Sequence, residues 1–222
     1  MHTSPVVVTV AGHGEATFAP ERCTVTVVVR IETGDVERSV GTATATVSRL
    51  TELINAQFDS NHGPINWWSL DQVRHSRHRP YNKDGLQLPY VYRAEAALEV
   101  KFSQLGAVGG FVDSVSTLEG VNVGNFDWAL TSKSRAARIV QVRELAIRDA
   151  QSKAETYARS LGRNTVHPVA IADPGMLGVD AGSSYGAVGA RAFAAGGSNE
   201  AIALKPENIT LSADVHARFE AW

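Results

Sequence analysis

The sequence predicts an α+β protein in which mainly antiparallel, one-sided sheets are packed by a long alanine-rich helix and one or two shorter helices. Two observations predict this class. Several segments alternate apolar and polar residues, which is typical of strands with one buried face, and residues 132–162 carry an unbroken helical pattern. One-sided strands belong to antiparallel sheets, because strands of parallel sheets are covered on both faces and are apolar throughout.

Alternation and β-branched residues define the expected strands. Three segments have this pattern, at residues 23–31, 94–102 and 209–219, and further strands are expected at 65–73 and 166–172. A sixth strand is expected at 121–130, where the apolar phase slips by one residue at Gly124–Asn125. Such a slip predicts a β-bulge.

Three helices are expected. The first covers residues 40–58, where apolar residues recur at helical spacing, and a shorter one covers 105–118. The longest begins at Ser132 or Ser134 as N-cap and ends before Gly162, the expected C′ residue.

One face of the longest helix is a ridge of small residues. Alanines recur at every fourth position, at Ala146, Ala150, Ala154 and Ala158. This ridge allows the helix to lie close against a sheet or another helix. On the other side, three acid–base pairs at i,i+4 spacing are expected to stabilise a solvated face, and these are Glu144–Arg148, Asp149–Lys153 and Glu155–Arg159.

Gly12 and Gly14 follow an apolar run near the N-terminus. A third glycine at the dinucleotide-binding spacing and a Gly-Lys-Ser/Thr ending are both absent from the sequence that follows. Pro20 and a β-branched strand come next, so no helix N-terminus is available to hold a phosphate. We expect a strand edge broken by these two glycines.

The length of 222 residues is enough to bury a sizeable core. We expect one domain over residues 1–222, with two lobes at 6–103 and 104–222 as the alternative. Residues 174–200 contain seven glycines and predict a flexible loop.

Composition narrows the class of partner. The formal net charge of −2 gives no overall attraction to nucleic acid or to anionic membranes. Cys23 is the single cysteine, so neither a disulfide framework nor a thiolate metal site is expected. Without a secretion signal or an apolar run of about 18 residues, the sequence predicts a soluble, cytoplasmic protein with no membrane span. We expect no cofactor and no metal.

One local cluster is basic and has aromatic neighbours. Its residues are Trp67, Trp68, Arg74, His75, Arg77, His78 and Arg79. We interpret residues 74–79 as an exposed basic loop, an expected interaction surface, with the tryptophans as stacking platforms if the ligand is a polyanion. His75-x-x-His78 lacks a third ligand and is read as a pair of surface histidines.

Signals for catalysis are weak. Gly182-x-Ser184-x-Gly186 matches the nucleophile elbow of α/β-hydrolases, but the apolar strand and the helix that should flank it are missing. An enzyme would need a site assembled from scattered residues such as His13, Glu15, His75 and His167.

The order of these segments resembles the SIMPL domain family, long grouped with domains of unknown function. The resemblance rests on five stretches in order, Val8–Gly14 with Ala19–Glu21, Arg79–Tyr81, Tyr92–Phe102, Phe126–Leu130 with Arg143–Gly162, and the strand after Lys205–Glu207. Glu21 stands where relatives usually have Asp, and the signal peptide common in bacterial relatives is not seen.

The resemblance implies no established catalytic residues. It implies a cell-envelope location in bacteria, protein contacts in eukaryotic signalling, and self-association. We therefore expect a non-enzymatic homo-oligomer that also binds other, undefined proteins. The alternatives are a polyanion or nucleic-acid binder that uses residues 74–79, and an enzyme with an unrecognised site.

Overall fold

The computed structural model describes residues 4–177 and 205–222. By their contacts these residues form two compact units. The first unit comprises 4–18, 132–177 and 208–222, and the second comprises 19–131 and 205–207. The division differs from the lobes 6–103 and 104–222 suggested by the sequence, because the first strand of the chain pairs with the last one.

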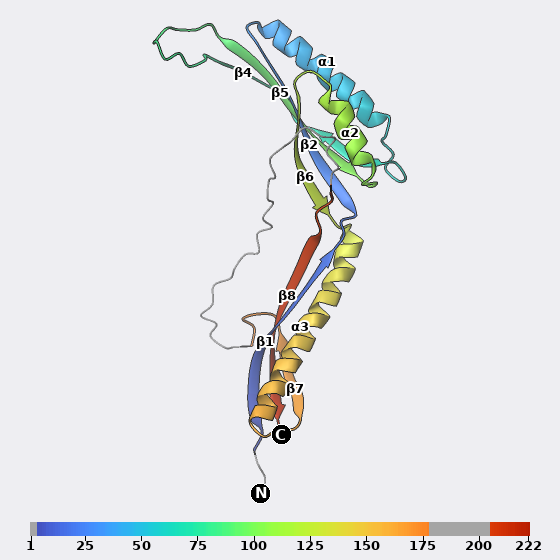
Figure 1. Ribbon diagram of the computed structural model, residues 1–222, viewed down its shortest axis with the longest axis vertical. Helices are drawn as coiled ribbons and strands as arrows, with labels where there is room; N and C mark the ends of the chain where they lie inside the picture. The colour runs from blue at the N-terminus through green and yellow to red at the C-terminus, as the bar shows by residue number, and fades with distance from the viewer. Residues whose placement is uncertain (1–3, 178–204) are drawn as a thin grey trace. The chain divides into compact units, whose positions relative to one another are not determined.

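The first unit is a three-stranded antiparallel sheet with one long helix on one face (Figure 1). The strand order is β1-β8-β7, with β1 at Val6–Phe18, β8 at Ile209–Ala221 and β7 at Val166–Ala172. The helix is α3, Ser132–Ser160. The ladder between β1 and β8 runs without a break from Val6↔Ala221 to Phe18↔Ile209.

The alanine ridge of α3 packs against this sheet, as predicted. Ala146, Ala150, Ala154 and Ala158 are all buried, together with Val8 and Val10 of β1 and with Val215, Ala217 and Phe219 of β8. Small residues along the helix allow its backbone to approach the strands closely.

Gly12 and Gly14 do not break β1, so the expected interruption is wrong. Both lie inside the continuous ladder, on the face covered by α3. A Cβ at Gly12 would lie 2.1 Å from the Ala146 carbonyl oxygen, and one at Gly14 would lie 2.2 Å from that of Val142. Glycine is therefore required at these two positions by the close approach of the helix backbone.

The end of α3 follows the expected capping chemistry. Gly162 has a φ of +72°, and its N–H donates to the Arg159 carbonyl at 3.0 Å while the Arg163 N–H donates to the Ala158 carbonyl at 2.9 Å. This is the Schellman arrangement, in which a left-handed C′ residue closes the last turn.

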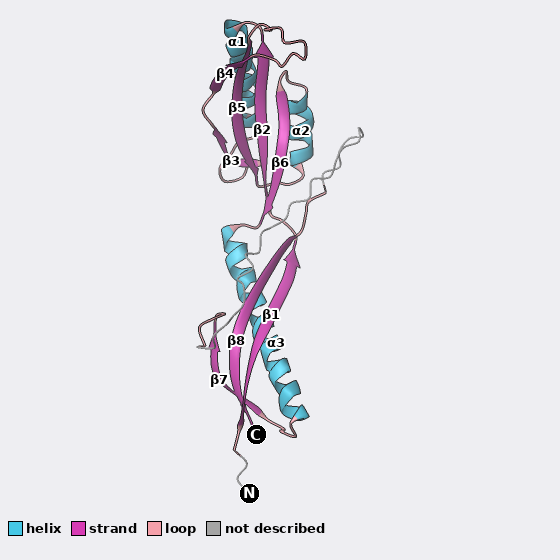
Figure 2. Cartoon of the chain, turned by 90° about the vertical axis from the view of Figure 1, so that its left-hand side faces the viewer, coloured by secondary structure: helices cyan, strands magenta, loops and turns pink. Residues whose placement is uncertain are grey.

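The second unit is a five-stranded antiparallel sheet with two helices on one face (Figure 2). The strand order is β3-β5-β2-β6, and β4 also pairs with β5. The elements are β2 (Arg22–Thr33), α1 (Val36–Asn55), β3 (Ile65–Leu70), β4 (Arg74–His78), β5 (Val91–Phe102), α2 (Ala107–Ser116) and β6 (Val121–Ala129).

The core of the second unit lies between the helices and the sheet. Alternate residues of β2 and β5 meet the apolar stripes of α1 and α2. The fully buried members include Val25, Val27, Leu50, Ile54, Leu98, Val100, Phe102, Val108 and Phe111. Phe102 and Phe111 meet edge to face, with ring centroids 5.2 Å apart. The opposite face of the sheet is polar or half-buried, so the one-sided pattern is confirmed.

Most boundaries agree with the sequence, and one helix is displaced. The bulge at Gly124–Asn125 is confirmed, because Val25 pairs with Phe126 but Val27 pairs with Val123. Helix α1 begins before residue 40, since the Asp35 side chain accepts the Arg38 N–H at 2.8 Å and caps it. It ends at Asn55 rather than 58.

The α+β class and the antiparallel sheets are thus confirmed. Among the helices that the structure describes, none combines the length and the apolar character needed to cross a membrane. Residues 178–200 of the expected flexible loop, with Ser184, lie outside the described residues.

Candidate functional site

The basic cluster lies in the second unit and forms a strand, not the expected loop. Residues 74–78 are β4, which pairs with β5 from Arg74↔Glu95 to His78↔Val91. All five residues are exposed. The segment contains no apolar residue, so the sequence shows no alternation of apolar and polar residues that would predict a strand. The strand forms through the backbone hydrogen bonds of its ladder with β5.

Alternation divides the cluster between two faces. His75 and Arg77 lie opposite Ala94 and Tyr92. Because Ala94 is buried with Ala43 of α1, His75 and Arg77 lie on the α1 side, and Arg74, Ser76 and His78 lie on the other side. His75 and His78 therefore point away from each other and cannot share a metal ion.

Two arginines stack on one tyrosine. The guanidinium carbons of Arg77 and Arg79 lie 4.9 Å and 4.2 Å from the centroid of the Tyr90 ring. Arg79 also donates to the side-chain oxygen of Gln87. Stacking on an aromatic face orients a guanidinium and leaves its N–H groups available at the edge.

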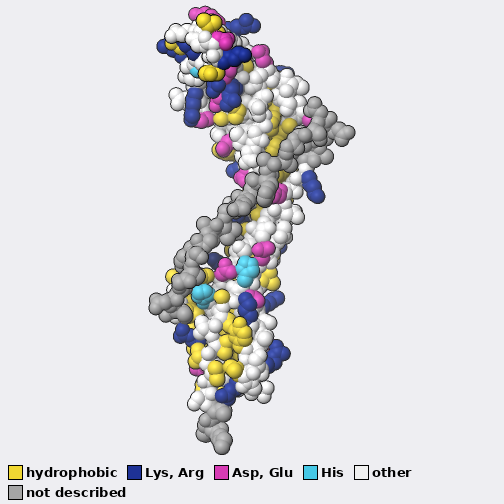
Figure 3. Space-filling model, turned by 60° about the vertical axis from the view of Figure 1, so that its left-hand side comes forward, with side chains coloured by type: hydrophobic (Ala, Val, Ile, Leu, Met, Phe, Trp, Pro, Cys, Tyr) yellow, Lys and Arg dark blue, Asp and Glu magenta, His cyan; other side chains and the backbone are white. Residues whose placement is uncertain are grey.

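A shallow groove of about 260 Å³ runs beside β4. It lies between β4 and the first turn of α1, and its lining includes Val36, Ser39, His75, Arg77 and Tyr92. Lys and Arg side chains gather over this end of the unit (Figure 3).

On the opposite face, the basic side chains are neutralised. Arg74 lies 3.4 Å from Asp71, Arg30 lies 2.6 Å from Glu95, and Arg93 pairs with Glu32. The hydrogen bond from Arg30 lowers the pKa of Glu95, and the charges of Arg93 and Arg74 lower it further.

The two tryptophans do not form a joint stacking platform. The two residues are neighbours on β3 and face opposite sides of the sheet. Trp68 packs against the core, whereas the Lys101 ammonium lies 4.9 Å from the centroid of the Trp67 ring. The two rings therefore do not share a face, because adjacent residues in a strand alternate, and their role as stacking platforms stays a prediction.

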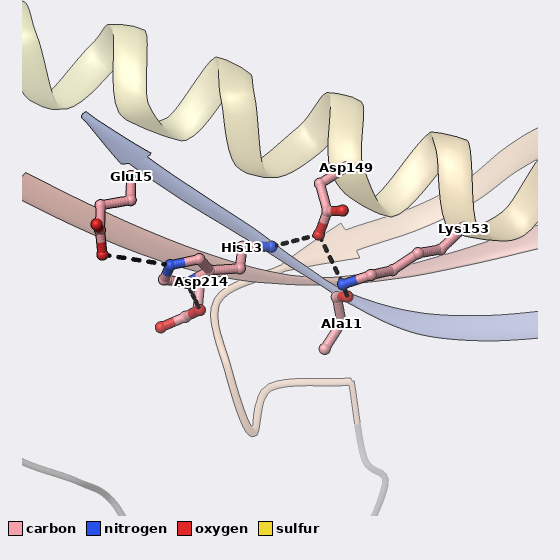
Figure 4. Close-up of polar contacts among 6 residues, drawn as sticks. All are labelled: Ala11, His13, Glu15, Asp149, Lys153 and Asp214. Atoms are coloured by element: carbon pink, nitrogen blue, oxygen red, sulfur yellow. Dashed lines mark hydrogen bonds and ion pairs between the residues drawn. The ribbon is translucent and has the colours of Figure 1, made fainter.

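The first unit contains a separate polar cluster, drawn in Figure 4. His13 and Glu15 lie on β1, and Asp214 lies directly opposite His13 on β8. The His13 Nδ1 is 2.7 Å from Asp214 Oδ1, and its Nε2 is 3.8 Å from Glu15 Oε2. The hydrogen bond to Asp214 is the main cause of the raised pKa of His13, and the charges of Asp214, Glu15 and Asp149 raise it further.

Side chains of α3 form hydrogen bonds with the backbone of β1 on the edge that does not pair with β8. The His13 N–H donates to Asp149 Oδ2 at 2.8 Å, and Lys153 Nζ donates to the Ala11 carbonyl at 2.9 Å and to Asp149 Oδ2 at 2.7 Å. Hydrogen bonds from Lys153 and from His13 lower the pKa of Asp149.

Of the three acid–base pairs predicted on α3, Asp149–Lys153 forms an ion pair, whereas Arg159 donates to the Glu155 backbone carbonyl.

Only part of the scattered set proposed for an enzyme comes together. His13 and Glu15 share the polar cluster, while His167 lies on β7 opposite Glu220 and His75 belongs to the second unit. The sequence missed Asp149 and Asp214 as partners of His13. No cluster of three or more His, Cys, Asp or Glu side chains suited to a metal occurs in residues 4–177 and 205–222.

Comparison with protein families gives one assignment. Residues 8–219 match the model of the SIMPL family, described as a protein of unknown function (DUF541). No curated protein matches the chain. The match begins in β1, ends in β8 and spans both units, so the resemblance seen in the sequence is confirmed. This chain belongs to the SIMPL family.

Proposed function

We propose that this protein is a non-enzymatic binding module that associates with a second copy of itself and with other proteins through the free strand edges of its sheets. Exposed edges carry unpaired N–H and C=O groups, to which another strand can pair. The observation that carries the proposal is the open part of the β1 edge in the first unit.

Among the described residues, the hydrogen bonds from α3 to that edge lie at its centre. Ala11 and His13 direct their backbone groups away from β8, towards Lys153 and Asp149. Because this direction alternates along a strand, Val7 and Thr9 present their backbone groups to the same side. Among the described residues, no side chain of α3 hydrogen-bonds to Val7 or Thr9.

An apolar groove accompanies the open part of the edge. It has a volume of about 410 Å³ and is lined by Val6, Val7, Val8, Thr9, Tyr157, Ser160 and Leu161. Val7, Tyr157 and Leu161 are 58%, 54% and 59% exposed. Covering apolar side chains of this size stabilises an interface.

A second copy of the same strand suits this groove. Antiparallel pairing about a two-fold axis at Val8 would bring Val7 of one copy opposite Thr9 of the other and would bury no charge. A closed two-fold interface needs a surface that is complementary to itself, and an uncharged edge strand meets this need.

The polar cluster supports a structural role better than a catalytic one. The side chains of His13, Glu15 and Asp214 are 53%, 59% and 58% exposed. Because these side chains are exposed to water, their charges are screened. They lack the enclosed, low-dielectric surroundings in which charges act strongly on a reacting group.

The test is molecular mass in solution, measured by light scattering over a range of concentrations. We expect the unmodified protein to form an oligomer and Val7→Lys to shift it to monomer. Val169→Lys is the matched control, since Val169 is also exposed, at 54%, but lies on β7. A protein that is monomeric at every concentration, or a control that dissociates as readily as Val7→Lys, would refute the proposal.

A further inference from the structure

We infer that the outer edge of β4 binds an extended acidic segment of another protein, which adds a strand beside β4 and places alternate carboxylates on His75, Arg77 and Arg79. The inference rests on the proposed function and supplies the class of partner for the second unit. It concerns a surface different from the β1 edge that we assign to self-association.

Main-chain groups of β4 are available on one side. Within the described residues, β4 pairs with β5 and with no other strand. Every one of its five residues is exposed, so no helix or loop in the described part of the chain buries it. Strands with this exposure are the usual acceptors of an added peptide strand.

The cationic face of β4 is not neutralised. In the described part of the chain, no carboxylate oxygen lies within ion-pair distance of Arg77 or Arg79. Their guanidinium groups are instead ordered on Tyr90, at 4.9 Å and 4.2 Å from the ring centroid. An acidic ligand would therefore meet preoriented donors, which lowers the entropic cost of binding.

The spacing of these cations defines the ligand. His75 and Arg77 of β4 and Arg79, which follows the strand, stand at every second position, so their side chains would be about 6.6 Å apart along an extended backbone. A paired strand with Asp or Glu at every second position has the same repeat. The groove lined by Val36, Ser39 and Tyr92 gives room for these side chains on the α1 side.

Protein is favoured over nucleic acid as the ligand. An open strand edge matches a polypeptide backbone, which nucleic acid does not have. On the other face Arg30, Arg93 and Arg74 are already paired with Glu95, Glu32 and Asp71, so that face offers a phosphate chain little positive charge, and Trp67 and Trp68 do not share a face.

The experiment measures binding of a fluorescein-labelled peptide in which Glu and Thr alternate, by fluorescence anisotropy at low and high salt. We expect binding that weakens with salt and becomes about tenfold weaker in the double variant Arg77→Ala/Arg79→Ala. The double variant Arg143→Ala/Arg148→Ala, which removes two exposed arginines of α3, is the charge-matched control and should bind normally. Circular dichroism checks that both variants are folded.

Two N-methylated peptides test strand addition directly. Methylation of the Glu amides and methylation of the Thr amides block opposite edges of the ligand strand, so one isomer should lose binding and the other should keep it. Equal binding by both isomers would overturn the inference. So would no peptide binding, or equally tight, Arg77/Arg79-dependent binding of a single-stranded oligonucleotide.

Failure of this inference is distinguishable from failure of the proposed function. Light scattering of the Arg77→Ala/Arg79→Ala variant reports self-association independently, because the β1 edge is unchanged. An oligomer that does not bind the acidic peptide would reject the β4 partner alone.

Discussion

Asp149 and Lys153, one turn apart on α3, close a ring of hydrogen bonds on the free edge of β1. Asp149 accepts the His13 N–H at 2.8 Å, Lys153 donates to the Ala11 carbonyl at 2.9 Å, and the two side chains are 2.7 Å apart. These are the groups that a neighbouring strand would bind. The helix therefore protects the centre of the edge and leaves its Val7 end open.

Asp149→Ala should make the His13 amide exchange its hydrogen faster with solvent. The carboxylate is the acceptor that this N–H has outside the ladder, so its removal exposes the amide to water. Hydrogen exchange followed by NMR or mass spectrometry measures the effect. Glu144→Ala, which removes an exposed acid from the same helix, should leave His13 protected. Unchanged His13 exchange in Asp149→Ala would show that the hydrogen bond does not protect the edge.

Gly12→Ala should destabilise the first unit by about 1–3 kcal/mol or more, because the new methyl group overpacks the contact between β1 and α3. Its Cβ would lie 2.1 Å from the Ala146 carbonyl oxygen and 2.8 Å from the Ala150 nitrogen. Both are backbone atoms, so the helix itself must shift. Chemical denaturation monitored by circular dichroism gives the change in unfolding free energy.

Gly41→Ala is the control for the glycine substitution. Gly41 lies on the exposed face of α1, and a Cβ there meets nothing within 4 Å. Alanine is the better helix former, so we expect stabilisation of up to about 1 kcal/mol. If Gly12→Ala were as stable as Gly41→Ala, the close approach of α3 to β1 would be wrong.

Protonation of His13 should stabilise the first unit. The hydrogen bond to Asp214 raises the pKa of His13 in the folded state above its ordinary value of 6.5. The stabilisation is complete below the unfolded pKa and is lost as the pH rises through the folded pKa. NMR titration of the His13 ring measures the pKa, and Asp214→Asn should lower it. A His13 pKa that Asp214→Asn leaves unchanged would exclude the pair as the cause.

Much of the first unit could be predicted from local sequence. The alanine spacing of α3 predicts its buried face because a helix repeats every 3.6 residues or so, and Gly162 predicts its end because a left-handed C′ residue favours glycine. In the second unit, the slip of the apolar phase at Gly124–Asn125 predicts the bulge of β6 in the same way. Each of these features depends on residues close together in the chain.

The features that could not be predicted from the sequence depend on residues that are far apart in the chain. His13 and Asp149 are 136 positions apart, and His13 and Asp214 are 201 positions apart. Neither contact can therefore be predicted from the spacing of residues in the sequence. β4 contains only polar residues, and its strand character comes from the unpaired length of β5 beside it. The role of Gly12 likewise requires knowledge of where the α3 backbone lies.

Cys23 should resist thiol reagents while the second unit is folded. The side chain is fully buried between β2 and the helices, and burial, with a contribution from Asp127, raises its pKa to about 12. Because the thiolate is the reactive form, labelling at neutral pH requires the unit to open. Stopped-flow labelling with a disulfide reagent should be slow in buffer and fast in denaturant. Ser48→Cys, on the exposed face of α1, should add one rapidly labelled thiol, and rapid labelling of the unmodified native protein would contradict the buried position of Cys23.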